Sequence, residues 1–191
     1  MLKTICVFCS SSSKIDEVYF KATLELADLC IKQKIHVLYG GGAFGLMGAL
    51  ADRMIKKKGK ISGIIPSFML DLKWGHDDIS EMIVVEDLRE RKKRMIDNVD
   101  AVVALPGGVG TLEELLEVIT LKQLGKFTKP IIIVNTHGFY DPLFRIFDQM
   151  IEKQFMRDVH RQLWITIDRP ADLLYAIKNT PEMDTDFNKI L

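Results

Sequence analysis

The sequence has no excess of charge of one sign. Its 191 residues include 26 Lys and Arg and 26 Asp and Glu, so the formal net charge at pH 7 is zero with His neutral. A balanced chain exerts no net attraction on DNA, RNA or anionic lipid, although a local basic patch remains compatible with this balance. We therefore expect no nucleic-acid partner.

Long hydrophobic runs are also missing. The longest, such as residues 101–106 and 130–134, are far shorter than the ~20 residues that a membrane helix needs. The stretch Leu2–Cys9 contains one Lys, and it lacks both the apolar length and the small-residue cleavage site of a signal peptide. We expect a cytoplasmic protein with no membrane contact.

Cysteine is scarce. Cys6 and Cys9 form a CxxC pair inside a strand-like run, whereas redox motifs of this spacing use a helix N-terminus to lower the thiol pKa. The third cysteine is Cys30, and no second pair of Cys or His completes a zinc site. The prediction is three buried, inert thiols and no metal.

The remaining composition is that of an ordinary globular protein. Hydrophobic residues make up 48% and charged residues 27%, with 13 Gly and 6 Pro. At this length we expect a single domain over residues 1–191, with a polar C-terminal tail from about residue 180.

Short apolar runs alternate with longer segments of helical period along the whole chain. The pattern predicts strands at Thr4–Cys9, Ile35–Tyr39, Ile61–Ile65, Met82–Val85, Ala101–Leu105, Pro130–Val134 and Leu163–Ile167. It predicts helices at Val18–Gln33, Leu46–Lys58, Asp87–Asn98, Thr111–Leu124, Asp141–Gln154 and Ala171–Asn179. Residues 66–80, with Pro, Gly and several Asp, are expected to form a loop that covers a site.

Nearly continuous apolar strands between helices are typical of a parallel sheet that is covered on both faces. The sequence therefore predicts an α/β fold, a doubly wound Rossmann-like domain. Ligands of such sheets bind beyond the carboxyl ends of the strands, so the turns that follow the strands are the candidate site.

The first glycine-rich turn runs from Tyr39 to Gly48, after a predicted strand and before a helix. Free N–H groups and the dipole at the helix start favour an anion there. Gly40, Gly42 and Gly45 fit GxGxxG, but the acidic residue that a dinucleotide site needs ~20 positions later is absent. No Gly-Lys-Ser/Thr follows, which excludes a P-loop. A tight turn needed only for packing is the alternative interpretation.

The second glycine-rich turn reads Leu105-Pro106-Gly107-Gly108-Val109-Gly110-Thr111. Thr111 is a natural N-cap, and Glu114 three residues later would complete a capping box, which stabilises a helix by ~1 kcal/mol. The helix dipole would also keep the Glu114 carboxylate ionised, as a nucleophile or cation-stabilising group requires. Both roles are compatible with the sequence.

The run Asp87–Met95 carries four basic residues in succession, Arg91-Lys92-Lys93-Arg94. Most of this run fits a solvated helix face. Its first residues nevertheless follow a predicted strand directly, so an arginine there would suit a phosphate or leaving-group contact through its fixed, charged fork.

Together these segments closely resemble the LOG (Lonely Guy) family of cytokinin-activating phosphoribohydrolases. The resemblance covers roughly residues 4–155, and its most specific element is Arg91-Lys92 followed by Pro106-Gly107-Gly108-x-Gly110-Thr111-x-x-Glu114. Members were long labelled lysine decarboxylases, but the sequence has no convincing lysine motif for a pyridoxal phosphate Schiff base.

The resemblance implies hydrolysis of the N-glycosidic bond of an adenosine 5′-monophosphate, often one with an isoprenoid on its exocyclic amine, to free base and ribose 5-phosphate. A carboxylate suits this reaction because positive charge builds up at the anomeric carbon. No metal or redox cofactor is implied. The family's roles fall on Glu114 and Arg91 as catalytic residues, and on Gly41, Gly42, Met47, Lys92, Gly107, Gly108, Gly110, Thr111, Glu113 and Thr120 as substrate- or phosphate-binding residues.

The chain departs from the family pattern at several positions. Ser10 stands where Gly is common and Leu88 where Met is common, and Val109 and Leu121 replace an aromatic residue and Trp. A His of the family corresponds to His76, but the substrate-contacting Glu three residues earlier is Lys73 here. These changes leave plain AMP or another purine nucleotide open as the substrate.

A second hypothesis is a non-catalytic protein that binds a nucleotide or carries the molybdenum cofactor, since a similar fold serves that purpose. Retention of Arg91 and Glu114 favours the enzyme. The resemblance also implies a homodimer through helices next to the site. The apolar positions Leu112, Leu115, Leu116, Ile119 and Leu124 would supply such a face, or would simply cover the sheet.

Overall fold

One seven-stranded parallel sheet runs through the molecule, for which a computed structural model describes residues 2–181. The strand order is β4-β3-β2-β1-β5-β6-β7. The strands are β1 (Thr4–Phe8), β2 (His36–Tyr39), β3 (Ile61–Pro66), β4 (Met82–Val85), β5 (Ala101–Ala104), β6 (Ile131–Val134) and β7 (Ile165–Ile167). The predicted parallel sheet is confirmed.

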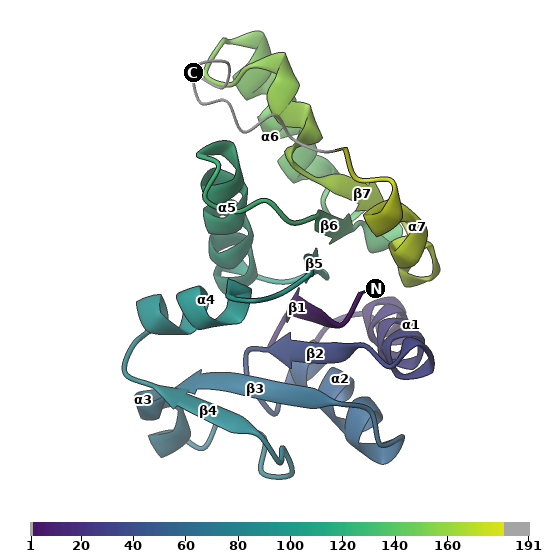
Figure 1. Ribbon diagram of the computed structural model, residues 1–191, viewed down its shortest axis with the longest axis vertical. Coiled ribbons are helices and arrows are strands. Elements are labelled where there is room, and N and C mark those ends of the chain that lie inside the picture. The colour runs from purple at the N-terminus through teal and green to yellow at the C-terminus, as the bar shows by residue number, and fades with distance from the viewer. Residues whose placement is uncertain (1, 182–191) are drawn as a thin grey trace.

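Helices cover both faces of this sheet (Figure 1). One face carries α1 (Glu17–Gln33), α2 (Gly45–Lys56) and α7 (Leu173–Lys178), and the other carries α4 (Leu88–Ile96), α5 (Val109–Gln123) and α6 (Asp141–Glu152). The strands supply two apolar cores, because successive side chains point to opposite faces: Ile5 and Val7 join one, Cys6 and Phe8 the other. The doubly wound α/β prediction is confirmed.

The helix starts follow from local chemistry. The Asp16 carboxylate accepts from the Val18 N–H at 3.0 Å before α1. The Asp87 carboxylate accepts from the N–H groups of Arg89 and Glu90, at 2.8 Å each, before α4. Such caps satisfy backbone donors that have no acceptor within the helix.

Several predicted boundaries need correction. Residues 66–80 are not all loop, because Ser67–Asp71 form the short helix α3, and five residues are too few to show a helical period in the sequence. The last strand begins at Ile165 instead of Leu163, since η2 (Asp158–Leu163) precedes it. Two further 3-10 turns are η1 (Thr136–Gly138) and η3 (Pro170–Asp172), and η3 delays the start of α7 to Leu173.

Cys6, Cys9 and Cys30 are free and buried, which confirms the predicted burial. Burial raises the pKa of the Cys30 thiol to about 12, so that thiol is uncharged near neutral pH. Within residues 2–181, no helix combines the length and the apolar character needed to cross a bilayer. Residues 182–191, which make up most of the predicted polar tail, lie outside the described residues.

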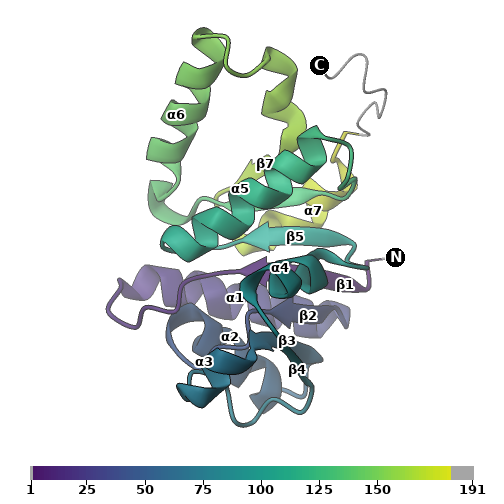
Figure 2. The same ribbon diagram turned by 90° about the vertical axis from the view of Figure 1, so that its left-hand side faces the viewer.

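The strand order reverses between β1 and β5, which are neighbours in the sheet. This is the switch point at which doubly wound sheets leave a crevice beyond the carboxyl ends of their strands. Figure 2 shows α4 and α5 in front of this part of the sheet. The segments that follow β1 and β5 are therefore placed at the candidate site.

Candidate functional site

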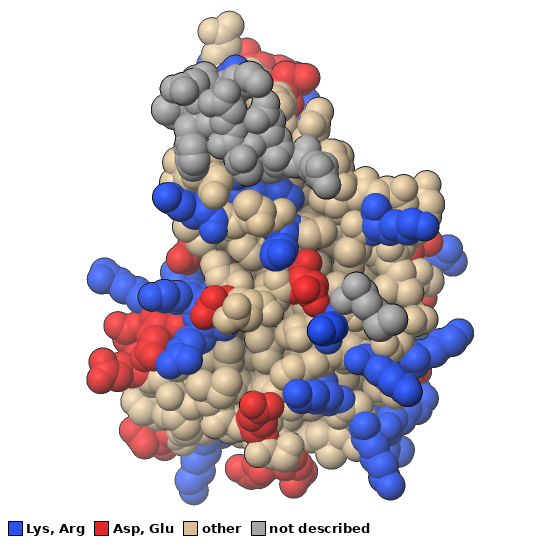
Figure 3. Space-filling model, viewed as in Figure 1, with Lys and Arg blue, Asp and Glu red and all other residues tan. Residues whose placement is uncertain are grey.

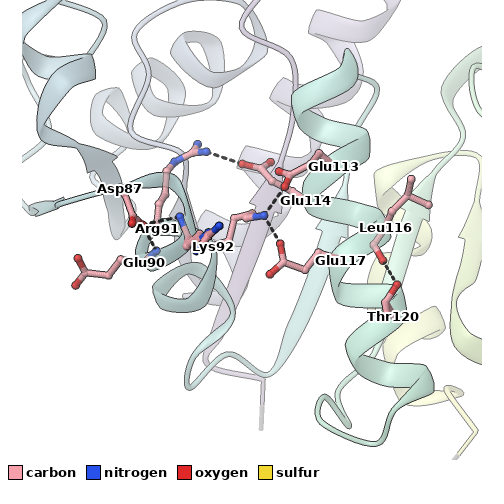
Figure 4. A network of polar contacts seen from close by, with 10 residues as sticks. Asp87, Glu90, Arg91, Lys92, Glu113, Glu114, Leu116, Glu117 and Thr120 are labelled. Atoms are coloured by element: carbon pink, nitrogen blue, oxygen red, sulfur yellow. Dashed lines mark hydrogen bonds and ion pairs between the residues drawn. The ribbon is translucent and has the colours of Figure 1, made fainter.

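A buried ion pair joins the two faces of the candidate site. Arg91, on the first turn of α4, donates through Nη1 to Glu114 Oε1 at 2.7 Å, and Glu114 lies on α5 (Figure 4). The Arg91 Nε donates to the Ile64 carbonyl at 3.1 Å and its Nη2 to the Gly40 carbonyl at 3.3 Å. Two backbone carbonyls and one carboxylate therefore fix the guanidinium, and a tenth or less of the Arg91 and Glu114 side chains is exposed.

The first glycine turn is shaped to admit this guanidinium. A Cβ at Gly40 would overlap Arg91 Nη2 and lie 3.3 Å from its Cζ. Only glycine lets the arginine approach the end of β2 this closely. The first glycine turn thus positions a catalytic candidate from a different part of the chain.

The environment of Glu114 differs from the one predicted. Burial raises the pKa of the Glu114 carboxyl group, and the charge and hydrogen bond of Arg91 act against that rise. We expected the dipole of its helix to keep the carboxylate ionised, but Arg91 is the neighbouring group that favours the ionised form.

The predicted capping box is wrong. The helix α5 begins at Val109 with Gly108 as its N-cap and no side-chain cap, so Thr111 lies inside the helix. The Thr111 side chain instead packs so closely on Gly107 that a Cβ there would overlap its hydroxyl. Glu114 turns toward Arg91, and the first N–H groups of α5 are left for another acceptor.

The first N–H groups of α2, the helix after the first glycine turn, already have acceptors within the protein. The Gly45 N–H donates to Ser13 Oγ at 3.2 Å, and the N–H groups of Leu46 and Met47 donate to the Ser10 carbonyl at 2.9 and 3.2 Å. These three N–H groups are therefore not available to the anion that we expected at the start of α2. The second glycine turn, which starts α5, is the better anion site.

Lys92 lies beside the buried pair but is engaged by other residues. Its ammonium group forms ion pairs with Glu113 and Glu117 on α5 (Figure 4). Hydrogen bonds to these two carboxylates raise the pKa of Lys92. Glu113, a candidate ribose contact, is half exposed and is held by Lys92.

A cavity of about 330 Å³ opens next to Arg91. Gly42 and Met47 lie in its wall, whereas Gly41 is buried against Ile65 and Met82. Residues 66–80, the segment predicted to cover a site, contribute Met69 of α3 and Trp74 to the wall of this cavity. The lining is Ser11, Ser13, Gly40, Gly42, Phe44, Met47, Ile65, Met69, Trp74 and Arg91.

A second cavity of about 280 Å³ borders the second glycine turn. Its lining is Ser10, Ser12, Ile15, Tyr19, Pro106, Gly107, Gly108 and Phe139. A Cβ built at Gly108 or at Gly110 would meet no atom within 4 Å. The start of α5 therefore faces open space that a ligand can occupy.

Thr120 lies apart from this group. It is exposed on α5, farther from the helix start than Glu114, and its hydroxyl donates to the Leu116 carbonyl at 2.8 Å (Figure 4). The structure does not bring it to the Arg91–Glu114 pair within this chain.

Some site groups were not singled out from the sequence. The carbonyls of Ile64 and Gly40 and the serines of residues 10–13 were missed. Carbonyls leave no signal in a sequence, but the serines follow the first strand directly, and the rule that ligands bind beyond strand ends would have found them.

The parallel sheet, its switch point and the glycine turns around a buried Arg–Glu pair define a Rossmann-like α/β protein. A family model described as "Possible lysine decarboxylase" matches residues 47–177. The chain is 36% identical over 92% of its length to the cytokinin riboside 5′-monophosphate phosphoribohydrolase LOG5 of Arabidopsis thaliana, covering 77% of that protein. It is 37% identical to LOG2 of the same plant, over 97% of this chain and 87% of the relative. The chain belongs to this LOG family.

Solved structures share the fold. The molybdenum cofactor binding protein of Rippkaea orientalis superposes with a TM-score of 0.70 at 21% identity, over 93% of this chain and 96% of that one. The molybdenum cofactor carrier protein of Chlamydomonas reinhardtii superposes with a TM-score of 0.70 at 18% identity, over 94% of this chain and 98% of that one. At such identities the likeness concerns the fold alone.

Proposed function

We propose that this protein hydrolyses the N-glycosidic bond of an adenosine 5′-monophosphate, either a cytokinin riboside monophosphate or AMP, to free base and ribose 5-phosphate. The observation that carries the proposal is the buried Arg91–Glu114 pair, whose arginine lines one of the two cavities. The names of the plant relatives support the same reaction.

The reaction requires a group that stabilises positive charge at the anomeric carbon. As the bond from C1′ to the base nitrogen breaks, its electron pair leaves with the base and the ribosyl group becomes cationic. The Glu114 carboxylate stabilises this cation or bonds to it, in a buried site where electrostatic interactions are strong. Water supplies hydroxide to C1′ and a proton to the departing base.

Arg91 has two functions in this scheme. The charge and hydrogen bond of its guanidinium oppose the effect of burial on the Glu114 pKa and so favour the ionised carboxylate. Held by the carbonyls of Gly40 and Ile64, it also presents a fixed donor to the cavity that contains it. It therefore contacts the leaving base or the ribose without a change of rotamer.

The 5′-phosphate belongs at the start of α5. Gly107, Gly108, Gly110 and Thr111 surround this helix end, whose N–H groups and dipole favour an anion. The open space at Gly108 and Gly110 leaves room for phosphate oxygens. Lys92 and Glu113, paired with each other, border the ribose.

We also propose a homodimer through α5. Of the five apolar positions considered, Leu115 and Ile119 are buried against the sheet, whereas Leu116 and Leu124 are 39% and 46% exposed. Thr120 lies between those two exposed leucines along the helix. A partner packed on this stripe would bring Thr120 into an interface.

The Glu114→Gln variant tests the reaction. Purified wild type should release free base and ribose 5-phosphate from AMP, from isopentenyladenosine monophosphate or from both, measured by chromatography. The variant keeps the shape of the side chain but loses its charge, so we expect kcat to fall by about 10³-fold. The ratio of kcat/KM for the two substrates decides between them.

Glu25→Gln is the matched control, because Glu25 is exposed on α1 and should leave kcat unchanged. Folded wild type that turns over neither nucleotide would contradict the proposal and favour a nucleotide or molybdenum-cofactor carrier. Turnover that persists in Glu114→Gln would contradict the role of this carboxylate.

A further inference from the structure

Four consecutive serines, Ser10–Ser13, form the segment that separates the two cavities. They follow β1 directly, at the switch point of the sheet. Ser11 and Ser13 line the cavity that contains Arg91, and Ser10 and Ser12 line the cavity at the second glycine turn. The serine segment therefore borders both cavities.

The backbone of Ser10 is fixed from both sides. Its N–H donates to the Pro106 carbonyl at 3.2 Å, at the second glycine turn. Its carbonyl accepts from Leu46 and Met47, at the start of α2 after the first glycine turn. Ser10 thus connects the two glycine turns, and its side chain has little freedom to move away.

Within the described part of the chain, the Ser10 hydroxyl accepts a hydrogen bond but donates none. Its oxygen accepts the Ser12 N–H at 3.0 Å, and no acceptor for its proton occurs among residues 2–181. Ser10 is 8% exposed and lines the cavity at the second glycine turn. An acceptor on a ligand bound in that cavity would take this proton.

The cavity that Ser10 lines also contains Gly107 and Gly108, at the N-terminal end of α5. No side chain among the described residues caps the N–H groups at the start of this helix, and these groups together with the helix dipole favour an anion. A hydroxyl donor beside them adds a hydrogen bond to an anionic oxygen, which is stronger than one to a neutral acceptor.

We propose that the Ser10 hydroxyl donates a hydrogen bond to the 5′-phosphate of the substrate, beside the N–H groups of the second glycine turn. This inference rests on the proposed function and assigns the serine segment to it. Ser10 is a binding residue for the phosphate, so it selects nucleotides over nucleosides and contributes little to bond cleavage.

The experiment compares wild type with Ser10→Ala by calorimetry and by steady-state kinetics. The variant should bind ribose 5-phosphate and AMP about tenfold more weakly, as expected for one lost hydrogen bond to a charged group. Binding of adenosine, which lacks the phosphate, should be unchanged, and KM for the nucleotide should rise while kcat stays within about twofold. The surface variant Ser80→Ala is the matched control.

Unchanged binding of ribose 5-phosphate by Ser10→Ala would overturn the inference. Equal weakening of AMP and adenosine would also overturn it, because that result indicates a purely structural role through the Ser12 N–H. A wild type that hydrolyses no nucleotide, yet binds ribose 5-phosphate in a Ser10-dependent way, would refute the proposed function and leave the phosphate contact standing. Absence of ribose 5-phosphate binding by the wild type would refute the contact, whatever the activity.

Discussion

At Glu114, burial and an ion pair act on one carboxyl group in opposite directions. Burial raises its pKa, and Arg91 draws the pKa back down. The net effect is a pKa above the ordinary value of this carboxyl group, and loss of Arg91 would raise that pKa further. A group of this kind responds strongly to the charge that develops on a bound substrate.

The acidic side of the pH profile should reflect this raised pKa. The reaction needs ionised Glu114, so kcat is expected to fall with decreasing pH at a midpoint above the ordinary value of 4.5. The measurement is kcat from pH 4 to 8, with folding followed by circular dichroism at each pH. Full activity maintained at pH 4.5 would contradict the prediction.

Lys122 is a second buried ionisable residue, on α5, and the proposed chemistry does not use it. Burial lowers its pKa from 10.5 to about 8, and its ammonium group donates to the Lys129 carbonyl at 3.0 Å. Between pH 8 and 10.5 the unfolded chain therefore binds more protons than the folded one. The free energy of unfolding should rise with pH across this window.

Lys122→Met should remove this part of the pH dependence. Between pH 7.5 and pH 10.5, the free energy of unfolding should rise by about 1–2 kcal/mol more in the wild type than in the variant. Denaturant unfolding at several pH values measures it, with Lys32→Met, an exposed lysine of α1, as the control. Parallel curves for wild type and Lys122→Met would show that Lys122 titrates normally.

Among the elements, α4 has the most direct link to the proposed function, because it carries Arg91 in its first turn. The Asp87 cap fixes that start by accepting two N–H groups. The site also depends on the Ile64 carbonyl within β3 and on the Gly40 carbonyl just after β2, which hold the guanidinium. Stability of one helix end and geometry of the site are therefore coupled.

Asp87→Ala tests this coupling. Loss of the cap should lower the free energy of unfolding by about 1 kcal/mol. Because the first turn of α4 then frays, Arg91 shifts from Glu114 and kcat should fall by about tenfold. Asp16→Ala is the matched control, since it removes the cap of α1 at a similar cost in stability but should leave kcat unchanged. Equal kcat in the two variants would argue against the coupling.

At the scale of the whole molecule, the proposed dimer needs an exposed apolar surface. On the face in Figure 3 basic and acidic side chains both occur, with tan surface between them. The exposed leucines are Leu116 of α5 and Leu124, which caps the end of this helix, and the same helix carries Glu114. A dimer through α5 would place two sites next to its interface.

Light scattering coupled to gel filtration tests the dimer. The wild type should have twice the chain mass of 21.8 kDa. The double variant Leu116→Lys and Leu124→Lys should elute at the monomer mass, since two buried charges oppose association. Leu72→Lys, at an exposed leucine outside α5, should remain a dimer. A monomeric wild type would end the dimer proposal.

The sequence by itself determined the sheet, the order of most elements and the two catalytic candidates. Buried strands such as Ile131–Val134 appear as continuous apolar runs because both of their faces are covered, and this pattern is local. Arg91 and Glu114 were found because the motifs that contain them resemble those of the LOG family. The short helix α3 was missed because five residues show no period.

Only the tertiary structure decided what these residues contact. The capping box of Thr111 and Glu114 was a sound local prediction, but Arg91, 23 positions away in the sequence, draws the carboxylate to itself. Likewise, Ser10 occupies the N–H groups that the first glycine turn was expected to offer to an anion. Local patterns follow from neighbouring residues, whereas the partner of a buried charge or donor is set by which distant segments the fold brings within hydrogen-bond reach.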